Sequence, residues 1–229
     1  MSTITISKYM VAIMIRITTF TEVGGHKTNE DAFIVREAPE QPGSWFCVLA
    51  DGQGGQAGGG PAAQLAGSSA MELAINQPIT NLLRSGWDSI LRQADQTVAN
   101  DPQAGCTTLI GFVATDEWLV GASCGDSAVL VVSANEKPRI ATAHQLKNPP
   151  VGSGEAMFVP FSLKLITPWA IIAMTDGVWK YVGWDAIVEA VQEYDGQELI
   201  EMLQVKARMP GNGRFQDDFT IVLLESHSV

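Results

Sequence analysis

The chain has 229 residues, of which 46% are hydrophobic and 17% are charged, so it can bury a sizeable core and is not disordered by composition. Its formal net charge of −11 argues against nucleic acid as the main partner, because binding to a phosphate backbone depends on clustered lysine and arginine. We expect a single domain over residues 1–229, in which residues 1–8 form an extension that adds little to the fold.

The cysteines and the apolar segment near the start indicate the compartment. Cys47, Cys106 and Cys124 each lie in an apolar run, and no pair has CxxC spacing, which favours buried thiols over a disulfide framework or a zinc site. The apolar run Met10–Ile15 is much shorter than the roughly 20 residues of a membrane span. We therefore expect a cytoplasmic protein that does not bind membranes, and we expect it to be a monomer.

The hydrophobic pattern predicts blocks of strands separated by pairs of helices. Strands are predicted from runs of β-branched and aromatic residues bounded by turn residues, and helices from apolar residues at a spacing of three and four. In chain order, the predicted elements are strands at Met10–Thr19, Ala32–Arg36 and Trp45–Ala50, helices at Pro61–Asn76 and Ile79–Ala99, strands at Cys106–Ala114, Trp118–Cys124, Ala128–Ser133, Arg139–Thr142, Met157–Ile166 and Ala170–Met174, helices at Trp184–Tyr194 and Gln197–Arg208, and a strand at Phe219–Leu224. This order favours an α+β fold, with antiparallel sheets and helices packed outside them.

Short acidic turns at the ends of strands are the chemically suggestive feature. They are Asn29-Glu30-Asp31, Asp51-Gly52, Gly125-Asp126, Asp176-Gly177 and Asp217-Asp218. A carboxylate that ends a buried strand is costly to keep charged, and several together repel one another, but a divalent cation removes both problems. Oxygen ligands of this kind suit Mg²⁺ or Mn²⁺. The alternative is that Asp-Gly forms an ordinary hairpin turn, although neither Asp51 nor Asp176 is followed by the matching strand.

Six motifs in order carry a resemblance to a known family. NEDAF, LADGQGG, GCTTL, CGDS, MTDG and DDFTIV extend from about Gly24 to Leu224, and together they resemble the type 2C metal-dependent protein phosphatases, which are serine/threonine phosphatases with bacterial members. Each motif alone is weak, whereas the ordered set is specific. The resemblance implies a four-layer sandwich, in which two antiparallel β-sheets lie between helices, and a two-metal centre at one end of it.

The resemblance also implies the roles of the acidic residues. Asp51 bridges both metal ions, and Gly52 offers its backbone carbonyl as a ligand. Asp176 and Asp217 complete the ligand set of the other metal ion. The remaining positions are Glu30 and Asp31, which act through water or from outside the ligand set, and Asp126, which matches a third-metal position of bacterial relatives. A water that bridges two cations loses its proton easily, and the resulting hydroxide attacks phosphorus in line.

The chain departs from the family at positions that affect substrate binding. His26 and Lys27 stand where the family has a phosphate-anchoring arginine, whose bidentate fork neither residue reproduces. Either residue could bind phosphate, and an exposed, solvated Lys27 is the plain alternative. Gln53 replaces a histidine proposed as general acid, and Ala128 replaces an arginine. The segment between His144 and Asp176 is short, which predicts that the family's flap is reduced or absent.

Three hypotheses for function remain open at this point. The first is a Mg²⁺- or Mn²⁺-dependent phosphatase, with two or possibly three ions, that acts on phosphoserine or phosphothreonine in a phosphorylated protein substrate. The second is a phosphatase of small phosphoesters, which an open site without a flap would suit. The third is a phosphatase-like binding module that has lost turnover, which the residues His26 and Gln53 favour.

Overall fold

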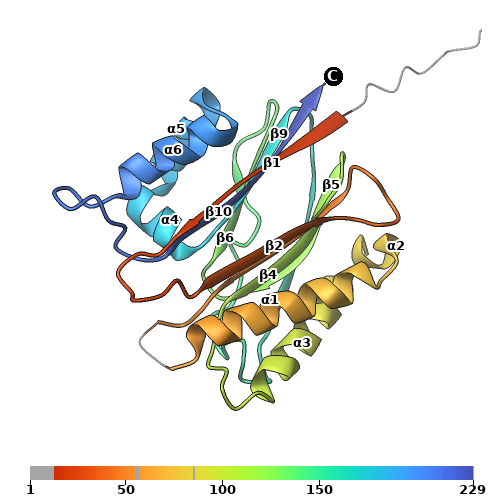
Figure 1. Cartoon of the computed structure of the whole chain (residues 1–229). Coiled ribbons are helices and arrows are strands. Elements are labelled where there is room, and N and C mark those ends of the chain that lie inside the picture. Colours follow the sequence, from red (N-terminus) through yellow and green to blue (C-terminus); the bar gives the residue numbers. More distant parts are fainter. Residues whose placement is uncertain (1–12, 55–56, 85, 229) are drawn as a thin grey trace, which may run out of the picture.

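The computed structural model describes residues 13–54, 57–84 and 86–228, and it arranges their helices and strands in four layers (Figure 1). Two five-stranded sheets form the middle layers, and all paired strands are antiparallel. The first sheet has the strand order β1 (Ile13–Glu22), β10 (Phe219–Ser228), β9 (Trp169–Met174), β6 (Ala128–Ser133) and β7 (Arg139–Ile140). The second has the order β2 (Asp31–Glu37), β3 (Trp45–Asp51), β4 (Leu109–Ala114), β5 (Trp118–Cys124) and β8 (Val159–Lys164).

The helices form the two outer layers. The second sheet is covered by α1 (Gly59–Ile75), α2 (Ile79–Leu82) and α3 (Gly86–Ala99). The first sheet is covered by α4 (Asp176–Val182), α5 (Trp184–Glu193) and α6 (Gly196–Ala207). The expected four-layer sandwich of antiparallel sheets between helices is confirmed.

Both sheets are apolar on both faces, because each is packed between another sheet and a helical layer. Successive residues of a strand point to opposite faces, so Val48 packs toward α1 and α3 while Leu49 packs between the sheets. In β9, Ile171 packs between the sheets while Ile172 packs against the helices α4 to α6. This double burial explains why strands such as WFCVLA and AIIAMT read as continuous apolar runs.

One predicted helix was wrong and one helix of the structure was not predicted. The single helix predicted at Ile79–Ala99 is interrupted, because α2 ends at Leu82 and α3 begins at Gly86. Glycine has low helix propensity, and a Cβ at Gly86 would lie 3.1 Å from the Asn81 carbonyl oxygen. The helix α4 was not predicted, because Asp176-Gly177 was interpreted only as a turn after a strand.

Strand boundaries differ from the prediction by a few residues. The pairing of β1 with β10 extends along both strands, from Ile13 opposite Ser228 to Glu22 opposite Phe219. The predicted start of β1 at Met10, like the proposed extension over residues 1–8, lies outside the described residues. Residues 141–158, between β7 and β8, contain no helix or strand, as a reduced flap predicts.

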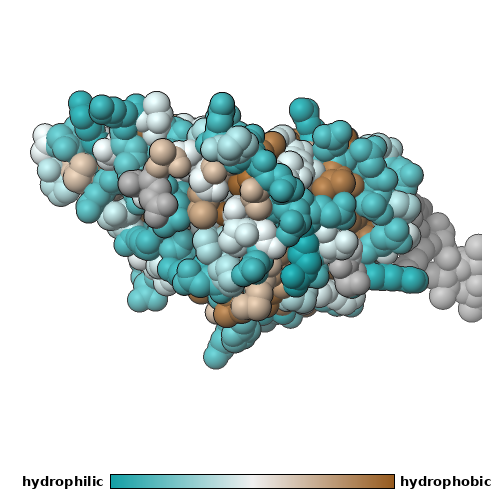
Figure 2. Space-filling view, turned by 90° about the horizontal axis from the view of Figure 1, so that it is seen from below, coloured by the Kyte–Doolittle hydropathy of each residue, from teal (hydrophilic) through white to brown (hydrophobic). Residues whose placement is uncertain are grey.

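Apolar side chains on the surface are few and scattered. The face shown in Figure 2 is mostly hydrophilic, with apolar residues in small patches. The most exposed large hydrophobic residues among those described are Val205 and Met14. Scattered residues of this kind are normal for a protein surface and need no partner to explain them. Within the described ranges, none of the helices combines the length and the apolar character needed to cross a membrane.

Candidate functional site

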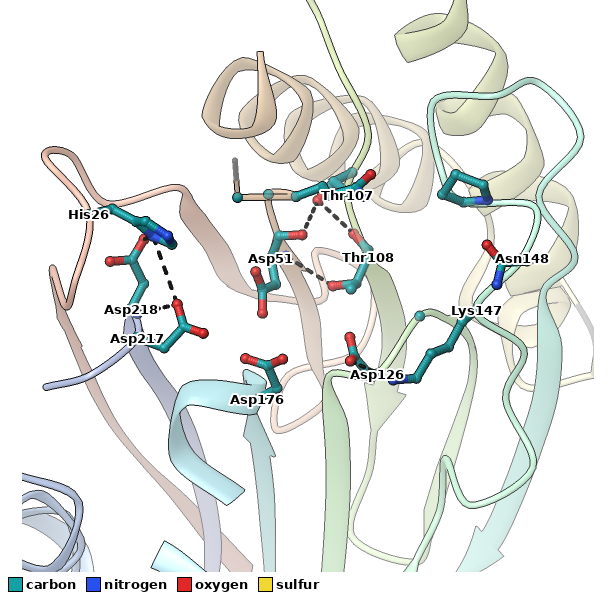
Figure 3. A pocket seen from close by; sticks show the side chains of 15 residues that line it. His26, Asp51, Thr107, Thr108, Asp126, Lys147, Asn148, Asp176, Asp217 and Asp218 are labelled. Carbon is teal, nitrogen blue, oxygen red and sulfur yellow. Dashed lines mark hydrogen bonds and ion pairs between the residues drawn. The ribbon is translucent and has the colours of Figure 1, made fainter. Parts of the chain in front are cut away.

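Separate segments of the chain bring their carboxylates to one end of the sandwich. Asp51 is the last residue of β3, Asp176 follows β9 as the first residue of α4, and Asp217 lies just before β10. Asp126 lies in the turn between β5 and β6. All of these residues line a cavity of about 490 Å³, and in Figure 3 their side chains gather around the same space. The structure therefore brings carboxylates from widely separated parts of the chain to one place.

Glycines allow the acidic segments to approach one another this closely. A Cβ at Gly24 or at Gly177 would collide with the backbone of Asp217 or Asp218, and one at Gly52 would lie 2.5 Å from the Gly59 carbonyl oxygen. Glycine is therefore required on steric grounds after both Asp51 and Asp176. The Asp-Gly motifs reflect close packing of backbone rather than hairpin turns.

The two threonines of the GCTTL motif hold the backbone of Asp51. The Asp51 amide donates a hydrogen bond of 3.0 Å to Thr108 Oγ1, and the Asp51 carbonyl accepts one of 2.8 Å from Thr107 Oγ1. Thr108 Oγ1 also shares a hydrogen bond of 2.8 Å with Ser127 Oγ, in the turn that carries Asp126. These bonds fix the relative positions of the segments that carry Asp51 and Asp126.

Burial and mutual repulsion make the charged form of these carboxylates unfavourable. Burial, together with repulsion from neighbouring carboxylates, raises the pKa of Asp51 to about 9, far above its usual value of 3.8. The repelling groups are Asp31, Asp176, Asp126 and Asp217. Burial likewise raises the pKa of Asp176, although its hydrogen bond from Lys180 acts in the opposite direction.

Asp31 is the second strongly perturbed carboxyl group. Burial raises its pKa to about 7, although a hydrogen bond from Thr175 stabilises the charged form. Its Oδ2 accepts a bond of 2.9 Å from Thr175 Oγ1, whereas its Oδ1 is buried without a hydrogen-bond partner among the described residues. An orphaned carboxylate oxygen beside Asp51, its partner in the β2–β3 ladder, is the kind of atom that a cation or its water would satisfy.

Asp217 and Asp218 have different surroundings. The Asp218 side chain is only 5% exposed, and its oxygens accept hydrogen bonds from the amides of Gly24 (2.8 Å) and Glu30 (2.7 Å). The Asp217 side chain is 34% exposed and lines the cavity. Asp218 therefore anchors the loop between β1 and β2, which leaves Asp217 available to a ligand. The sequence analysis did not find this anchoring role, because it depends on a contact across most of the chain.

Of the two residues predicted to bind phosphate, His26 lies at the cavity and Lys27 does not. His26 lines the cavity, and its Nδ1 is 3.8 Å from Asp217 Oδ1 and 3.7 Å from Asp218 Oδ2. Lys27 is exposed and is not among the residues that line the cavity. Glu30 also lies outside the lining, but its carbonyl accepts a hydrogen bond of 3.1 Å from the amide of Gly52. The roles assigned to these residues stay predictions.

Two lysines at the site were missed by the sequence analysis. Lys147 Nζ lies 2.7 Å from Asp126 Oδ2, and Lys180 Nζ contacts Asp176 and lies 3.6 Å from Asp126 Oδ2. Lys180 is four residues after Asp176 on α4, so a prediction of that helix would have revealed this pair. Lys147 lies in the segment between β7 and β8, where no local pattern indicates its partner.

The chemistry of the donor set fits divalent cations. The cavity presents several carboxylate oxygens and no cysteine or sulfur ligand, which suits Mg²⁺ or Mn²⁺. In the described part of the chain, no three His, Cys, Asp or Glu side chains are already arranged as a metal site. Side-chain rotations, including release of Asp176 by Lys180, are therefore needed before these carboxylates can share an ion.

Comparisons with known proteins agree with the geometry. The family model described as protein phosphatase 2C matches residues 24–205. A bacterial serine phosphatase structure aligns with a TM-score of 0.78 at 16% identity, covering 94% of this chain and 99% of its own. The catalytic domain of the serine/threonine protein phosphatase PstP, in complex with two manganese ions, aligns with a TM-score of 0.73 at 21% identity, covering 94% and 99%. RsbX in complex with magnesium aligns with a TM-score of 0.71 at 14% identity, covering 93% and 96%. No curated protein matches the chain.

Proposed function

This chain belongs to the protein phosphatase 2C family, and from that premise we propose that it is a Mg²⁺- or Mn²⁺-dependent phosphatase that hydrolyses phosphoserine or phosphothreonine in proteins. The reaction breaks the phosphorus–oxygen ester bond by attack of water, and it releases inorganic phosphate and the free hydroxyl. The manganese and magnesium in two of the similar structures support the choice of cation. We also propose a cytoplasmic location, which is supported by thiols that form no disulfide.

The observation that carries the proposal is the crowding of Asp51, Asp176 and Asp217 around one cavity. Burial and repulsion raise the pKa of Asp51 to about 9, so this group cannot stay charged at neutral pH without a cation beside it. A binding module without catalysis has no chemical need to hold these charges together. Divalent cations bound here would supply an activated water and positive charge for the phosphoryl oxygens.

The residues of the chain have distinct roles in this proposal. Asp51 and the Gly52 carbonyl would hold the ions from one sheet, and Asp176 and Asp217 would hold them from the other sheet. Glu30 and Asp31 would act through water, since Glu30 does not line the cavity and Asp31 has an oxygen without a hydrogen-bond partner among the described residues. No protein nucleophile is required.

The substrate side of the cavity is bordered by a segment without helix or strand, residues 141–158. His26 lies beside Asp217 and Asp218, where its protonated ring could contact a phosphate oxygen. The segment 141–158 stands in place of a flap and contributes Lys147 and Asn148 to the lining. An open site of this kind also favours the second candidate, a phosphatase of small phosphoesters.

An activity assay with two substrates separates the three hypotheses. With Mn²⁺, we expect turnover of both p-nitrophenyl phosphate and a phosphothreonine peptide, a higher kcat/KM for the peptide, and complete loss of both activities with a chelator. A strong preference for the small ester would favour the second candidate. Binding of Mn²⁺ without turnover of either compound would contradict both phosphatase proposals and favour the binding module.

A further inference from the structure

The turn that carries Asp126 is held from two sides by other segments of the chain. On one side, the Gly125 amide donates to the Leu146 carbonyl (2.8 Å), and Gln145 Nε2 donates to the Ser127 carbonyl (2.6 Å). On the other side, Trp179 Nε1 of α4 donates to the Asp126 carbonyl (2.9 Å). The backbone around Asp126 is thus fixed relative to both neighbouring segments.

Each of these segments carries a lysine directly beside its hydrogen-bonded residue. Lys147 follows Leu146 and places its Nζ 2.7 Å from Asp126 Oδ2 (Figure 3). Lys180 follows Trp179 and places its Nζ 3.6 Å from the same oxygen. The Asp126 side chain is 22% exposed, whereas the side chains of Lys147 and Lys180 are 60% and 40% exposed, so water reaches the ammonium group of each pair and each pair alone is of modest strength.

A buried carboxylate outside the cavity anchors the chain that follows Lys147. Asp95 of α3 is 2% exposed, and its oxygens accept hydrogen bonds from the amides of Gly152 (2.6 Å), Gly154 (3.2 Å) and Ala156 (3.0 Å). The segment that carries Lys147 is therefore fixed both at the Asp126 turn and at α3. This arrangement keeps the ammonium group of Lys147 near Asp126.

Two other carboxylates that line the cavity, Asp51 and Asp217, differ from Asp126 in their partners. Among the residues that the structure describes, no lysine or arginine forms an ion pair with Asp31, Asp51 or Asp217. Lys180 contacts Asp176 directly and lies 3.6 Å from Asp126 Oδ2, so its ammonium group is shared between these two carboxylates. The lysine charge at the cavity is therefore gathered at Asp126 and Asp176, whereas Asp51 and Asp217 depend on an external cation.

We propose that Lys147 and Lys180 are the resident counter-cations of Asp126, so that this carboxylate is held by ammonium groups in place of a third metal ion. The proposal rests on the function proposed above. It replaces the interpretation, drawn from family resemblance, that Asp126 holds a third ion. The site then binds two metal ions, and lysine ammonium groups supply the positive charge at the position where a third ion would bind.

Counting bound Mn²⁺ ions tests this proposal without relying on activity. Isothermal titration and equilibrium dialysis would compare the wild type, the double variant Lys147→Met/Lys180→Met, and the control Lys137→Met/Lys164→Met. The control removes the same charge from exposed lysines outside the cavity. We expect two ions in the wild type and the control and three in the double variant. The added change Asp126→Ala should return the count to two.

The outcomes separate this proposal from the proposed function. No gain of an ion in the double variant, or a gain that survives Asp126→Ala, would overturn the role of the lysines. A wild-type count below two would instead contradict the two-metal function, whatever the difference between the variants. Thermal melting confirms that each variant is folded. If the double variant does not fold, the single change at Lys147, whose side chain is 60% exposed, carries the same comparison.

Discussion

Replacement of Asp51 by asparagine is expected to lower metal-dependent phosphatase activity by about a thousandfold or more. Asn has nearly the same shape but no charge, so it removes the carboxylate that two ions would share. Losing several kcal/mol of electrostatic stabilisation corresponds to about three or more powers of ten in rate. The measurement is kcat/KM for a phosphothreonine peptide at saturating Mn²⁺.

The same substitution should make the metal-free protein more stable. Since burial and repulsion raise the pKa of Asp51 to about 9, the folded state favours an uncharged group at this position. We therefore expect a higher Tm for Asp51→Asn than for the wild type in chelator at about pH 8. Asp116→Asn is the matched control, because Asp116 is exposed in the turn between β4 and β5. Near wild-type activity of Asp51→Asn would show that the site is assigned incorrectly.

The stability of the chelated protein should fall as pH rises, and Mn²⁺ should remove this loss. The folded-state pKa values of Asp31 (about 7) and Asp51 (about 9) lie above the usual 3.8, so the folded state binds more protons than the unfolded state between these limits. The free energy of unfolding therefore decreases with pH from about 4 upward, until the folded-state groups have also ionised. This sign is opposite to that of an ordinary salt-bridged carboxylate.

The magnitude and the measurement follow from linkage. At about pH 8, Mn²⁺ at 100 times the Kd for that pH adds about 2.7 kcal/mol, or roughly 5–10 °C in Tm for a domain of this size. At the same Mn²⁺ concentration the increment should be smaller at about pH 5, because the carboxylates must lose protons to bind metal and the Kd therefore rises as pH falls. Urea unfolding at both pH values, with Mn²⁺ and with chelator, measures it. An increment that is equal at the two pH values, or a chelated protein that is more stable at the higher pH, would contradict the crowding of these charges.

Much of the fold was predictable because the strands are apolar on both faces and are bounded by turn residues. WFCVLA and FTIVLL need no tertiary information to be identified as buried strands. The breaks in helical pattern were not predictable in the same way. The end of α2 at Leu82 and the short helix α4 depend on packing around Gly86 and Asp218, which local periodicity does not contain.

The acidic residues of the site were predictable because each follows or precedes a buried strand and belongs to an ordered motif set. The residues that support them were not. Lys147 is 21 positions from Asp126, the Trp179 indole reaches the same turn across 53 positions, and Asp218 holds the Gly24 amide across 194. These contacts depend on how the two sheets pack together. Sequence patterns therefore found the acidic residues that line the cavity, but not the groups that position or neutralise them.

The central claim is that carboxylates from separate segments converge to hold a pair of divalent cations. Anomalous scattering from a crystal grown with Mn²⁺ tests it most directly. The account predicts two Mn²⁺ peaks in the cavity, both within coordinating distance of Asp51 and one of them also bound by Asp176 and Asp217. Peaks only elsewhere on the protein, or an Asp51 carboxylate that contacts no Mn²⁺, would contradict it.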